Sequence, residues 1–194
     1  TVLEKNKLDG IDLDFEWAEN EKEYKDYSLA ILKMREVLGN KYLFSVSLHP
    51  VCYKISKEAI EAVDFISLQC YGPSPVRFPI EKYCSDIQMV LEYGIPKEKL
   101  VAGVPFYGVT KDNSKKTEAY FNFVQNGLVT SPAQNEVIYQ GDTYVFDGQD
   151  NIRIKTRYAK EQKLKGMMSW DLATDLPLSD SRSLLKTMTE ELRE

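Results

Sequence analysis

The chain has 194 residues, 43% of them hydrophobic and 28% charged, with a net charge of -5, which is typical of one globular domain with a substantial core. The negative charge argues against a nucleic-acid-binding surface, because such surfaces neutralise phosphates with clustered lysine and arginine. No apolar run approaches the roughly 20 residues needed to cross a bilayer, and residues 1–7 lack the pattern of a signal peptide.

The first predicted element is a strand in the stretch DGIDLDFEW, residues 9–17, where four acids stand among apolar side chains. From Asp12 onward the carboxylates recur at every second residue, a period that belongs to a β-strand. Asp12, Asp14 and Glu16 should therefore share one face, roughly 6 to 7 Å apart at each step. Ionised groups this close repel one another where water is scarce, so the pattern indicates a chemical role.

The rest of the chain alternates predicted helices with predicted strands. Apolar spacings of three and four predict a helix from Tyr24 to Leu38, ended by Gly39, and Ser56 is a suitable N-cap for a short second helix. Further helices are predicted at 79–94, at 151–166 and from Asp180, as its cap, to Leu192, and strands are predicted at 43–48, 64–71, 100–108 and 166–171. This alternation predicts parallel strands joined by crossover helices.

The fold is either an open doubly wound sheet or a closed (β/α)8 barrel. No glycine-rich phosphate loop follows a strand, which weakens the nucleotide-binding form of the open sheet. Barrel enzymes carry their active sites at the carboxyl ends of the strands, which is where the unusual polar and aromatic residues lie: Glu16, Gln69, Tyr71, Tyr107, Trp170 and Asp171. The barrel is favoured, as a single α/β domain over residues 1–194. A complete barrel has eight strands and about 250 residues, so the five predicted strands indicate part of one.

Residues 109–150 depart from the alternation. They contain a short predicted helix at 119–126 and a predicted hairpin at 137–149, with Gly141 and Asp142 at its turn. We interpret the segment as an insertion between a strand and its helix on the active-site side, where inserted loops commonly shape substrate binding.

In these motifs the sequence resembles glycoside hydrolase family 18, the chitinases and endo-β-N-acetylglucosaminidases. The family signature D-x-x-D-x-D-x-E closes the fourth strand of its barrel, and DGIDLDFE, residues 9–16, matches every required position. FISLQCYG, VAGVPFYG and GMMSWDLATD resemble the sixth, seventh and eighth strands. The resemblance runs from about Leu8 to Leu192. It implies strands four to eight of a TIM barrel, with the first three upstream of Thr1 and an insertion after strand seven.

The resemblance implies a retaining hydrolase of β-1,4-linked N-acetylglucosamine polymers, in which the substrate's acetamido oxygen is the nucleophile and an oxazolinium intermediate forms. Glu16 would be the acid that protonates the leaving oxygen, and burial beside Asp14 would favour its protonated form. Asp14 would bind the acetamido N–H and share a proton with Asp12. Tyr71 would donate a hydrogen bond to the acetamido oxygen.

The remaining implied contacts bind the substrate. Trp170 would form the apolar floor under the sugar ring, and Gln69, Tyr107 and Asp171 would line the same site. The family implies no cofactor, no metal and no membrane span, and it implies an oligo- or polysaccharide partner containing N-acetylglucosamine. It also implies a secreted, periplasmic or cell-surface location. Chitin, peptidoglycan-like polymers and N-glycan cores all remain open as substrates.

A catalytically weak or inactive carbohydrate-binding protein is the alternative, because some proteins of this fold act as lectins. Those lectins typically lose the acid at the position of Glu16, which this sequence keeps, so hydrolysis is favoured. Gly72 departs from the family pattern, since many members carry an aspartate after the tyrosine.

Metal binding is disfavoured. The pattern D-x-D-x-D resembles a calcium loop, but such loops need polar, glycine-bearing turns between the ligands, whereas Leu13 and Phe15 belong in a strand. The three cysteines, Cys52, Cys70 and Cys84, are odd in number and share no metal-ligand spacing. We interpret them as free thiols, with a single disulfide as the less favoured alternative.

Three further residues have competing interpretations. His49, the sole histidine, stands beside a proline at a strand end and is interpreted as a loop or rim residue, not as a catalytic base. Tyr107 fits core packing and a sugar contact equally well. Trp170 is assigned to the pocket, because it ends the last strand, although packing inside the barrel is an alternative.

Overall fold

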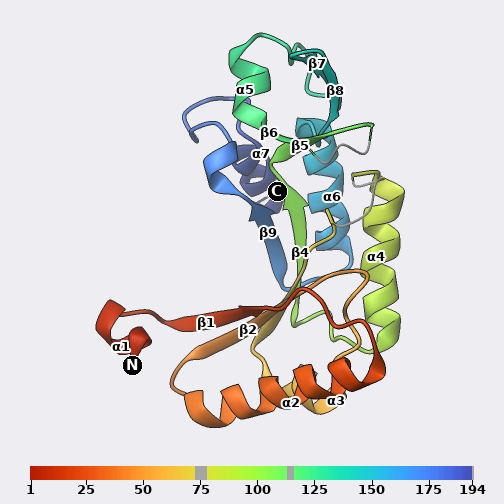
Figure 1. Cartoon of the computed structure of the whole chain (residues 1–194). Helices are drawn as coiled ribbons and strands as arrows, with labels where there is room; N and C mark the ends of the chain where they lie inside the picture. Colours follow the sequence, from red (N-terminus) through yellow and green to blue (C-terminus); the bar gives the residue numbers. More distant parts are fainter. Residues whose placement is uncertain (73–77, 113–115, 194) are drawn as a thin grey trace.

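The computed structural model describes residues 1–72, 78–112 and 116–193. Its core is a parallel sheet in which the strands lie side by side in chain order (Figure 1). The strands are β1 (Gly10–Asp14), β2 (Leu43–Leu48), β3 (Phe65–Leu68), β4 (Leu100–Pro105) and β9 (Gly166–Trp170). This order confirms the five predicted parallel strands. It also favours the barrel over the doubly wound sheet, whose strand order reverses direction partway.

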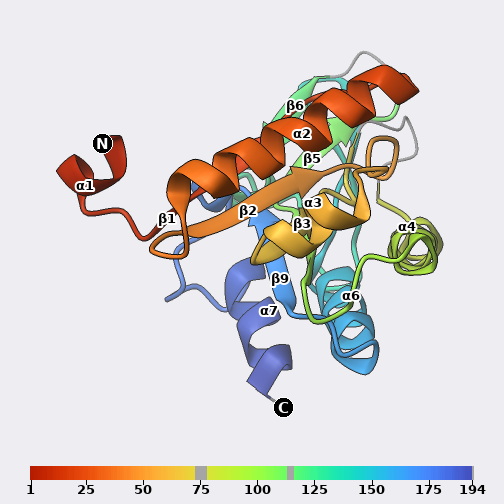
Figure 2. The ribbon, with the colours of Figure 1, turned by 90° about the horizontal axis from the view of Figure 1, so that it is seen from below.

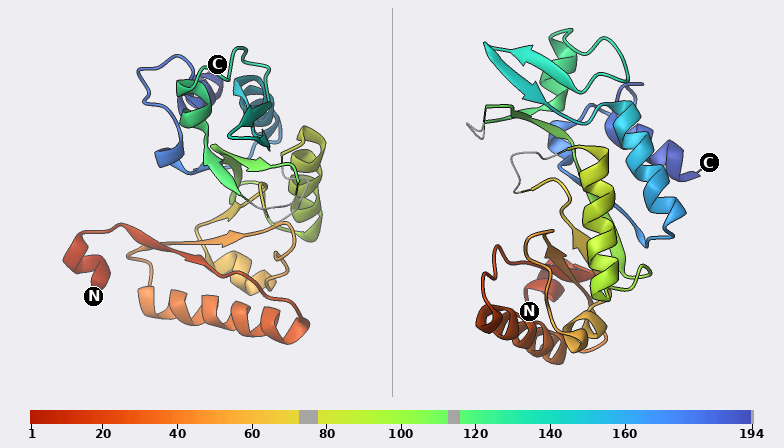
Figure 3. Two further views of the ribbon diagram at one scale, coloured as in Figure 1. Left: turned by 45° about the horizontal axis from the view of Figure 1, so that its top comes forward. Right: turned by 90° about the vertical axis from the view of Figure 1, so that its right-hand side faces the viewer.

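The helices that run along the outside of this sheet are α2 (Glu21–Leu38), α3 (Lys57–Ala62), α4 (Ile80–Tyr93), α6 (Gln149–Glu161) and α7 (Leu184–Arg193). Two short helices lie elsewhere: α1 (Val2–Asn6) precedes β1, and α5 (Tyr120–Gln125) belongs to the segment beyond β4. Helices α2 and α3 lie together along the β1–β3 side (Figure 2). On the other side α4, α6 and α7 follow one another (Figure 3). None of the helices described is long and apolar enough to cross a bilayer.

Two predicted helix boundaries are confirmed in atomic detail. The backbone N–H of Gly39 donates to the carbonyl of Arg35 and closes α2 with a positive φ of 59°, a conformation that favours glycine. The Ser56 hydroxyl accepts the backbone N–H of Ala59 at the start of α3, which is the N-cap bond that its side chain predicts.

The predicted cap of the last helix is wrong. The Asp180 carboxylate accepts the backbone N–H of Arg182, and α7 begins later, at Leu184. Ser183, directly before the helix, is the local cap, since its hydroxyl accepts the N–H of Lys186 at 3.1 Å. Asp175 adds a second cap, because its carboxylate oxygens accept the N–H groups of Leu184 at 3.0 Å and Leu185 at 2.9 Å. Because Asp175 lies nine residues before the helix, local spacing does not reveal its part.

The predicted strand from Leu100 to Gly108 is divided between two sheets. Strand β4 ends at Pro105, and the fully buried Phe106 donates its N–H to the carbonyl of Trp170. The chain then enters an antiparallel sheet of order β6-β5-β8-β7, formed by β5 (Tyr107–Thr110), β6 (Thr117–Ala119), β7 (Glu136–Tyr139) and β8 (Asp142–Val145). The sequence is apolar across this junction, so periodicity could not locate the break.

The antiparallel sheet and α5 lie beyond the ends of β4 and β9 (Figure 1). Helix α5 confirms the short helix predicted at 119–126. The hairpin is also confirmed, but its turn residues are Gln140 and Gly141, with φ values of 51° and 88°, and Asp142 already belongs to β8. Two consecutive positive φ values are typical of the tight turn that matches strand twist. Residues 113–115 of the predicted insertion lie outside the described residues.

The outer strands β1 and β9 each have one side without a strand partner in the described chain. Near β1 the side chains of Ile11 and Phe15 are 39% and 44% exposed. Open strand edges pair readily with other chains, so we expect the mass measured by light scattering to rise with protein concentration. Ile11→Lys, which places a charge at this edge, should weaken that rise. A constant monomer mass for the unchanged chain would contradict the expectation.

Candidate active site

The acids of β1 face a row of polar residues on β2. The two strands pair in parallel with Asp12 opposite Ser45 and Asp14 opposite Ser47. The hydroxyls of Ser45 and Ser47 donate to the Asp12 carboxylate at 2.5 and 2.8 Å, while the carboxylate oxygens of Asp14 and Glu16 lie within 4.8 Å of one another and of a nitrogen of His49. The prediction that the three acids share a face is confirmed.

The Asp14 carboxylate is also held by Gln69, the residue that follows β3. The side-chain amide of Gln69 donates to both carboxylate oxygens of Asp14, at 3.1 and 3.2 Å. Burial raises the pKa of Asp14, the charge of Glu16 raises it further, and the Gln69 hydrogen bond opposes this. The site therefore favours a proton on Asp14 more than water does. Sharing of that proton with Asp12 remains a prediction.

Glu16 lies two residues beyond the end of β1. The sequence predicts that it is buried beside Asp14, and this prediction is wrong. Its side chain is 44% exposed, and β1 is the outermost strand of the described sheet. Its Oε1 atom lies 3.0 Å from Nε2 of His49. His49 directly follows β2, as expected of a loop residue. It does not lie at the rim, since His49 is 3% exposed and its ring meets that of Trp17 edge-on, with centroids 3.9 Å apart.

Sequence reasoning missed the β2 side of this site. Ser45, Ser47 and His49 recur at every second position, so they face the same way along the strand and toward the acids. The period-two signal was present in the stretch LFSVSLH. The spacing predicts the strand at 43–48 but gives its polar side chains no role, because the residues between these three are apolar.

The close donor atoms of Asp14, Glu16 and His49 raise the question of a metal. The Nε2 atom of His49 already interacts with the Glu16 carboxylate, and the amide of Gln69 already occupies both oxygens of Asp14. A cation would displace these hydrogen bonds. We therefore describe the group as a hydrogen-bonded cluster and assign it no metal.

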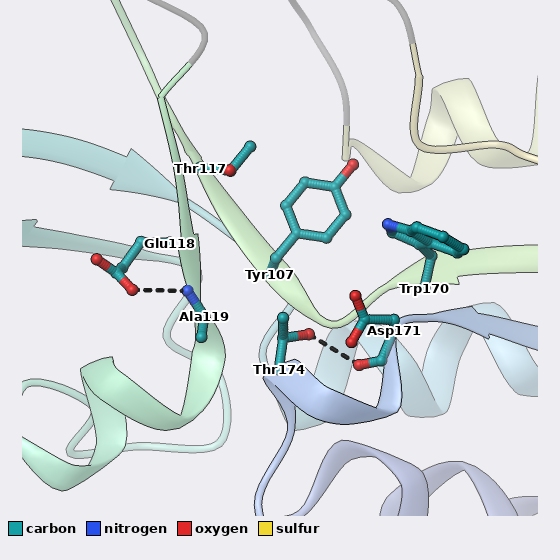
Figure 4. A pocket seen from close by; sticks show the side chains of 7 residues that line it. All are labelled: Tyr107, Thr117, Glu118, Ala119, Trp170, Asp171 and Thr174. Carbon is teal, nitrogen blue, oxygen red and sulfur yellow. Dashed lines mark hydrogen bonds between the residues drawn. The ribbon is translucent and has the colours of Figure 1, made fainter.

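The predicted aromatic residues form a pocket beyond β4 and β9 (Figure 4). This open hollow of about 270 Å³ is lined by Tyr107, Thr117, Glu118, Ala119, Trp170, Asp171 and Thr174. The Trp170 side chain is 57% exposed, so it does not fill the interior of the barrel. The Asp171 carboxylate accepts the N–H of Ala173 at 2.7 Å and so fixes the short 3-10 turn after β9. Thr117 and Glu118 were not predicted, because β6 reaches the pocket from the irregular segment.

Tyr71 joins the acid cluster to the aromatic pocket. It is buried, its hydroxyl donates to the Met168 sulfur at 3.8 Å, and its ring meets Tyr107 edge-on with centroids 6.3 Å apart. Burial raises the pKa of Tyr71, and the nearby Tyr107, Asp14 and Glu16 raise it further. The phenol therefore keeps its proton and remains a hydrogen-bond donor. The eight predicted site residues thus form two groups with Tyr71 between them.

Comparisons with known proteins, by sequence and by structure, all lead to the same family. The model of "Glycosyl hydrolases family 18" matches residues 1–175. The chain is 23% identical over 239 aligned residues to a probable chitinase 2 of Drosophila melanogaster, covering 90% of this chain and 49% of the fly protein. The chain spans about half the length of that curated relative.

Solved structures share the fold. A GH18 chitinase from Flavobacterium johnsoniae superposes with a TM-score of 0.80 at 26% identity, covering 98% of this chain and 62% of the bacterial one. A chitinase-like agglutinin from Robinia pseudoacacia superposes with a TM-score of 0.72 at 19% identity, covering 98% of this chain and 69% of the plant one. The described sheet is therefore part of a TIM barrel, as the strand order indicated.

Proposed function

Because the chain belongs to glycosyl hydrolase family 18, we propose that it hydrolyses β-1,4-linked N-acetylglucosamine polymers of the chitin type with retention of configuration. The observation that carries this proposal is the row of Asp12, Asp14 and Glu16 at the carboxyl end of β1. In this row the outermost acid is open to solvent and the inner acids are hydrogen-bonded to neighbouring strands. The similarity to chitinases supports the substrate class.

Glu16 acts as the proton donor. Its carboxyl group protonates the glycosidic oxygen while the bond from that oxygen to the anomeric carbon breaks. The carbonyl oxygen of the substrate's own acetamido group attacks the anomeric carbon, and an oxazolinium ion forms as the shortened sugar leaves. Glu16, now ionised, takes a proton from water, and the resulting hydroxide opens the oxazolinium on the face that the leaving group vacated. Two inversions give net retention.

The inner residues orient the acetamido group. Asp14 accepts the acetamido N–H, which increases the negative charge on the attacking carbonyl oxygen. The raised pKa of Asp14 supports a shared proton with Asp12, whose other contacts are the serine hydroxyls of β2. Tyr71 keeps its phenolic proton and donates to the acetamido oxygen, so the nucleophile is held in line with the bond that breaks.

The aromatic pocket binds the sugar. A pyranose ring has an apolar face that stacks on an exposed indole, and Trp170 offers such a surface. The Asp171 carboxylate lies beside Tyr107 and Trp170 in the same pocket (Figure 4), where it can accept hydrogen bonds from sugar hydroxyls. Gln69 contributes by holding Asp14.

Sugar binding without turnover is the second candidate. Two observations favour it: the likeness of the fold to a chitinase-like agglutinin, and the exposure of the Glu16 side chain, which leaves its carboxyl group in contact with water. The two candidates differ in one measurable property, release of product.

The test is fluorophore release from a diacetylchitobiose glycoside, with the matching cellobiose glycoside as control. We expect release from the first and none from the second, because a hydroxyl replaces the acetamido nucleophile and the rest of the ring is unchanged. Binding of diacetylchitobiose without release would favour the lectin function. Equal release from both glycosides would contradict substrate assistance, and neither binding nor release would contradict the proposal as a whole.

A further inference from the structure

The Glu16 carboxylate has a buried hydrogen-bond partner that none of the steps above uses. We propose that His49 is a positioning residue for Glu16: its imidazole holds the carboxyl group in the one orientation from which it reaches the glycosidic oxygen. The inference rests on the proposed function, because it assigns a task within the same reaction.

The geometry supplies the reason for positioning. A glutamate side chain that is 44% exposed has several rotamers open to it, and ordering it costs conformational entropy. The described contact that selects one of them is the 3.0 Å hydrogen bond between Oε1 and Nε2 of His49. Since His49 is 3% exposed, its ring is a fixed support. A proton donor must be held in place to reach the glycosidic oxygen.

The backbone of the segment after β2 is fixed as well. The N–H groups of His49 and Cys52 donate to each other's carbonyls, at 3.3 and 2.8 Å. The Cys52 sulfur in turn accepts the N–H of Ala18 at 3.2 Å, and the His49 ring packs on the edge of Trp17. The segment of residues 49–52 therefore contacts Glu16, Trp17 and Ala18. These contacts hold both the Glu16 side chain and the backbone that follows it.

The charge of the pair follows from its surroundings. Burial lowers the pKa of His49, while Glu16, Asp14 and the backbone of Gly72 oppose that shift by raising it. The ring is therefore neutral at neutral pH. With its proton on Nε2, the ring donates a hydrogen bond to the Glu16 carboxylate and holds it for the second step, in which Glu16 acts as the base.

The first experiment does not depend on turnover. His49 is the sole histidine, so its imidazole NMR signals need no assignment. We expect the titration midpoint of His49 to fall in Glu16→Gln, because the variant removes a negative charge that raises the pKa of His49. Glu19→Gln, at an exposed position three residues further on, is the matched control and should leave the midpoint unchanged. A midpoint equal in the original chain and in Glu16→Gln would overturn the pairing.

The second experiment compares His49→Leu with His49→Gln on the diacetylchitobiose glycoside. Leucine fills the buried site without a donor, so we expect kcat to fall about tenfold and KM to stay unchanged. The side-chain amide of glutamine restores an N–H near the position of Nε2. His49→Gln should therefore recover most of kcat.

The outcomes separate this inference from the proposed function. No turnover by the original chain would overturn both. Turnover that is lost in Glu16→Gln but keeps its kcat in His49→Leu would overturn the inference alone. Equal losses in His49→Leu and His49→Gln would reduce His49 to a packing residue, which also overturns it. If His49→Leu fails to fold, the NMR titration and the His49→Gln variant still test the inference. The titration uses Glu16→Gln, which changes an exposed side chain and should leave the fold intact.

Discussion

Glu16→Gln should reduce kcat on the diacetylchitobiose glycoside by about a thousandfold, which is within the contribution of a positioned general acid. The amide has nearly the shape of the carboxyl group but cannot transfer a proton to the leaving oxygen. Sugar binding should persist, because the pocket around Trp170 and the contacts of Asp14 do not involve Glu16. Fluorophore release measures the first effect, and calorimetric titration with a chitooligosaccharide measures the second.

Glu19→Gln provides the control for activity too, since it makes the same chemical change at an exposed site close by. It should keep the original kcat. If Glu16→Gln turned over as fast as this control, Glu16 could not be the proton donor. If Glu16→Gln lost sugar binding together with turnover, the substitution would have disturbed the pocket and the assignment of a purely chemical role would be wrong.

Lys155→Met should lower the free energy of unfolding by about 3 to 5 kcal/mol, the usual cost of removing one partner of a buried ion pair. The Lys155 ammonium donates to the Asp147 carboxylate at 2.5 Å and to the Phe78 carbonyl at 2.8 Å. The two charged side chains are 2% and 0% exposed. Methionine fills the space but leaves Asp147 charged and unpaired in the core. Urea denaturation followed by tryptophan fluorescence measures the change.

Arg153→Met is the control on the same helix. Arg153 pairs with Asp150, but these side chains are 38% and 45% exposed, and ion pairs in contact with solvent contribute less than about 1 kcal/mol. A cost for Lys155→Met no larger than that for Arg153→Met would show that water reaches the buried pair. A second substitution, Asp147→Leu, should recover part of the loss in Lys155→Met, because it removes the unpaired charge.

The sequence allowed the fold to be predicted wherever one element carried its own periodic signal. The acids of β1, the amphipathic pattern of α2 and the cap at Ser56 are all local features, and the structure has each of them. Placing the polar residues at strand ends required only that the strands be parallel. The contact between Asp14 and Gln69 follows from this, because the parallel strands of one sheet end at the same edge.

The features that sequence reasoning missed depend on partners far apart in the chain. Glu16 and His49 are 33 residues apart, and Asp175 caps a helix that begins nine residues later. The split at Phe106 arises because the chain leaves one sheet for another within an unbroken apolar run. The exposure of Glu16 goes with the outer position of β1 in the described sheet. Each of these depends on which surfaces meet, and residue spacing does not carry that information.

Because the Cys52 sulfur contacts the backbone of Ala18, the rate at which the Cys52 thiol is alkylated measures how often this part of the structure opens. Cys52 is 1% exposed, Cys70 is 3% exposed and Cys84 is half-buried, so an alkylating reagent reaches Cys84 in the folded molecule. It reaches Cys52 when the segment beside Glu16 lifts, and it reaches Cys70 when the end of β3 opens. The ratio of these two alkylation rates therefore reports whether the edge of the barrel opens by itself or together with its centre, and no residue of the acid cluster needs to be altered to measure it.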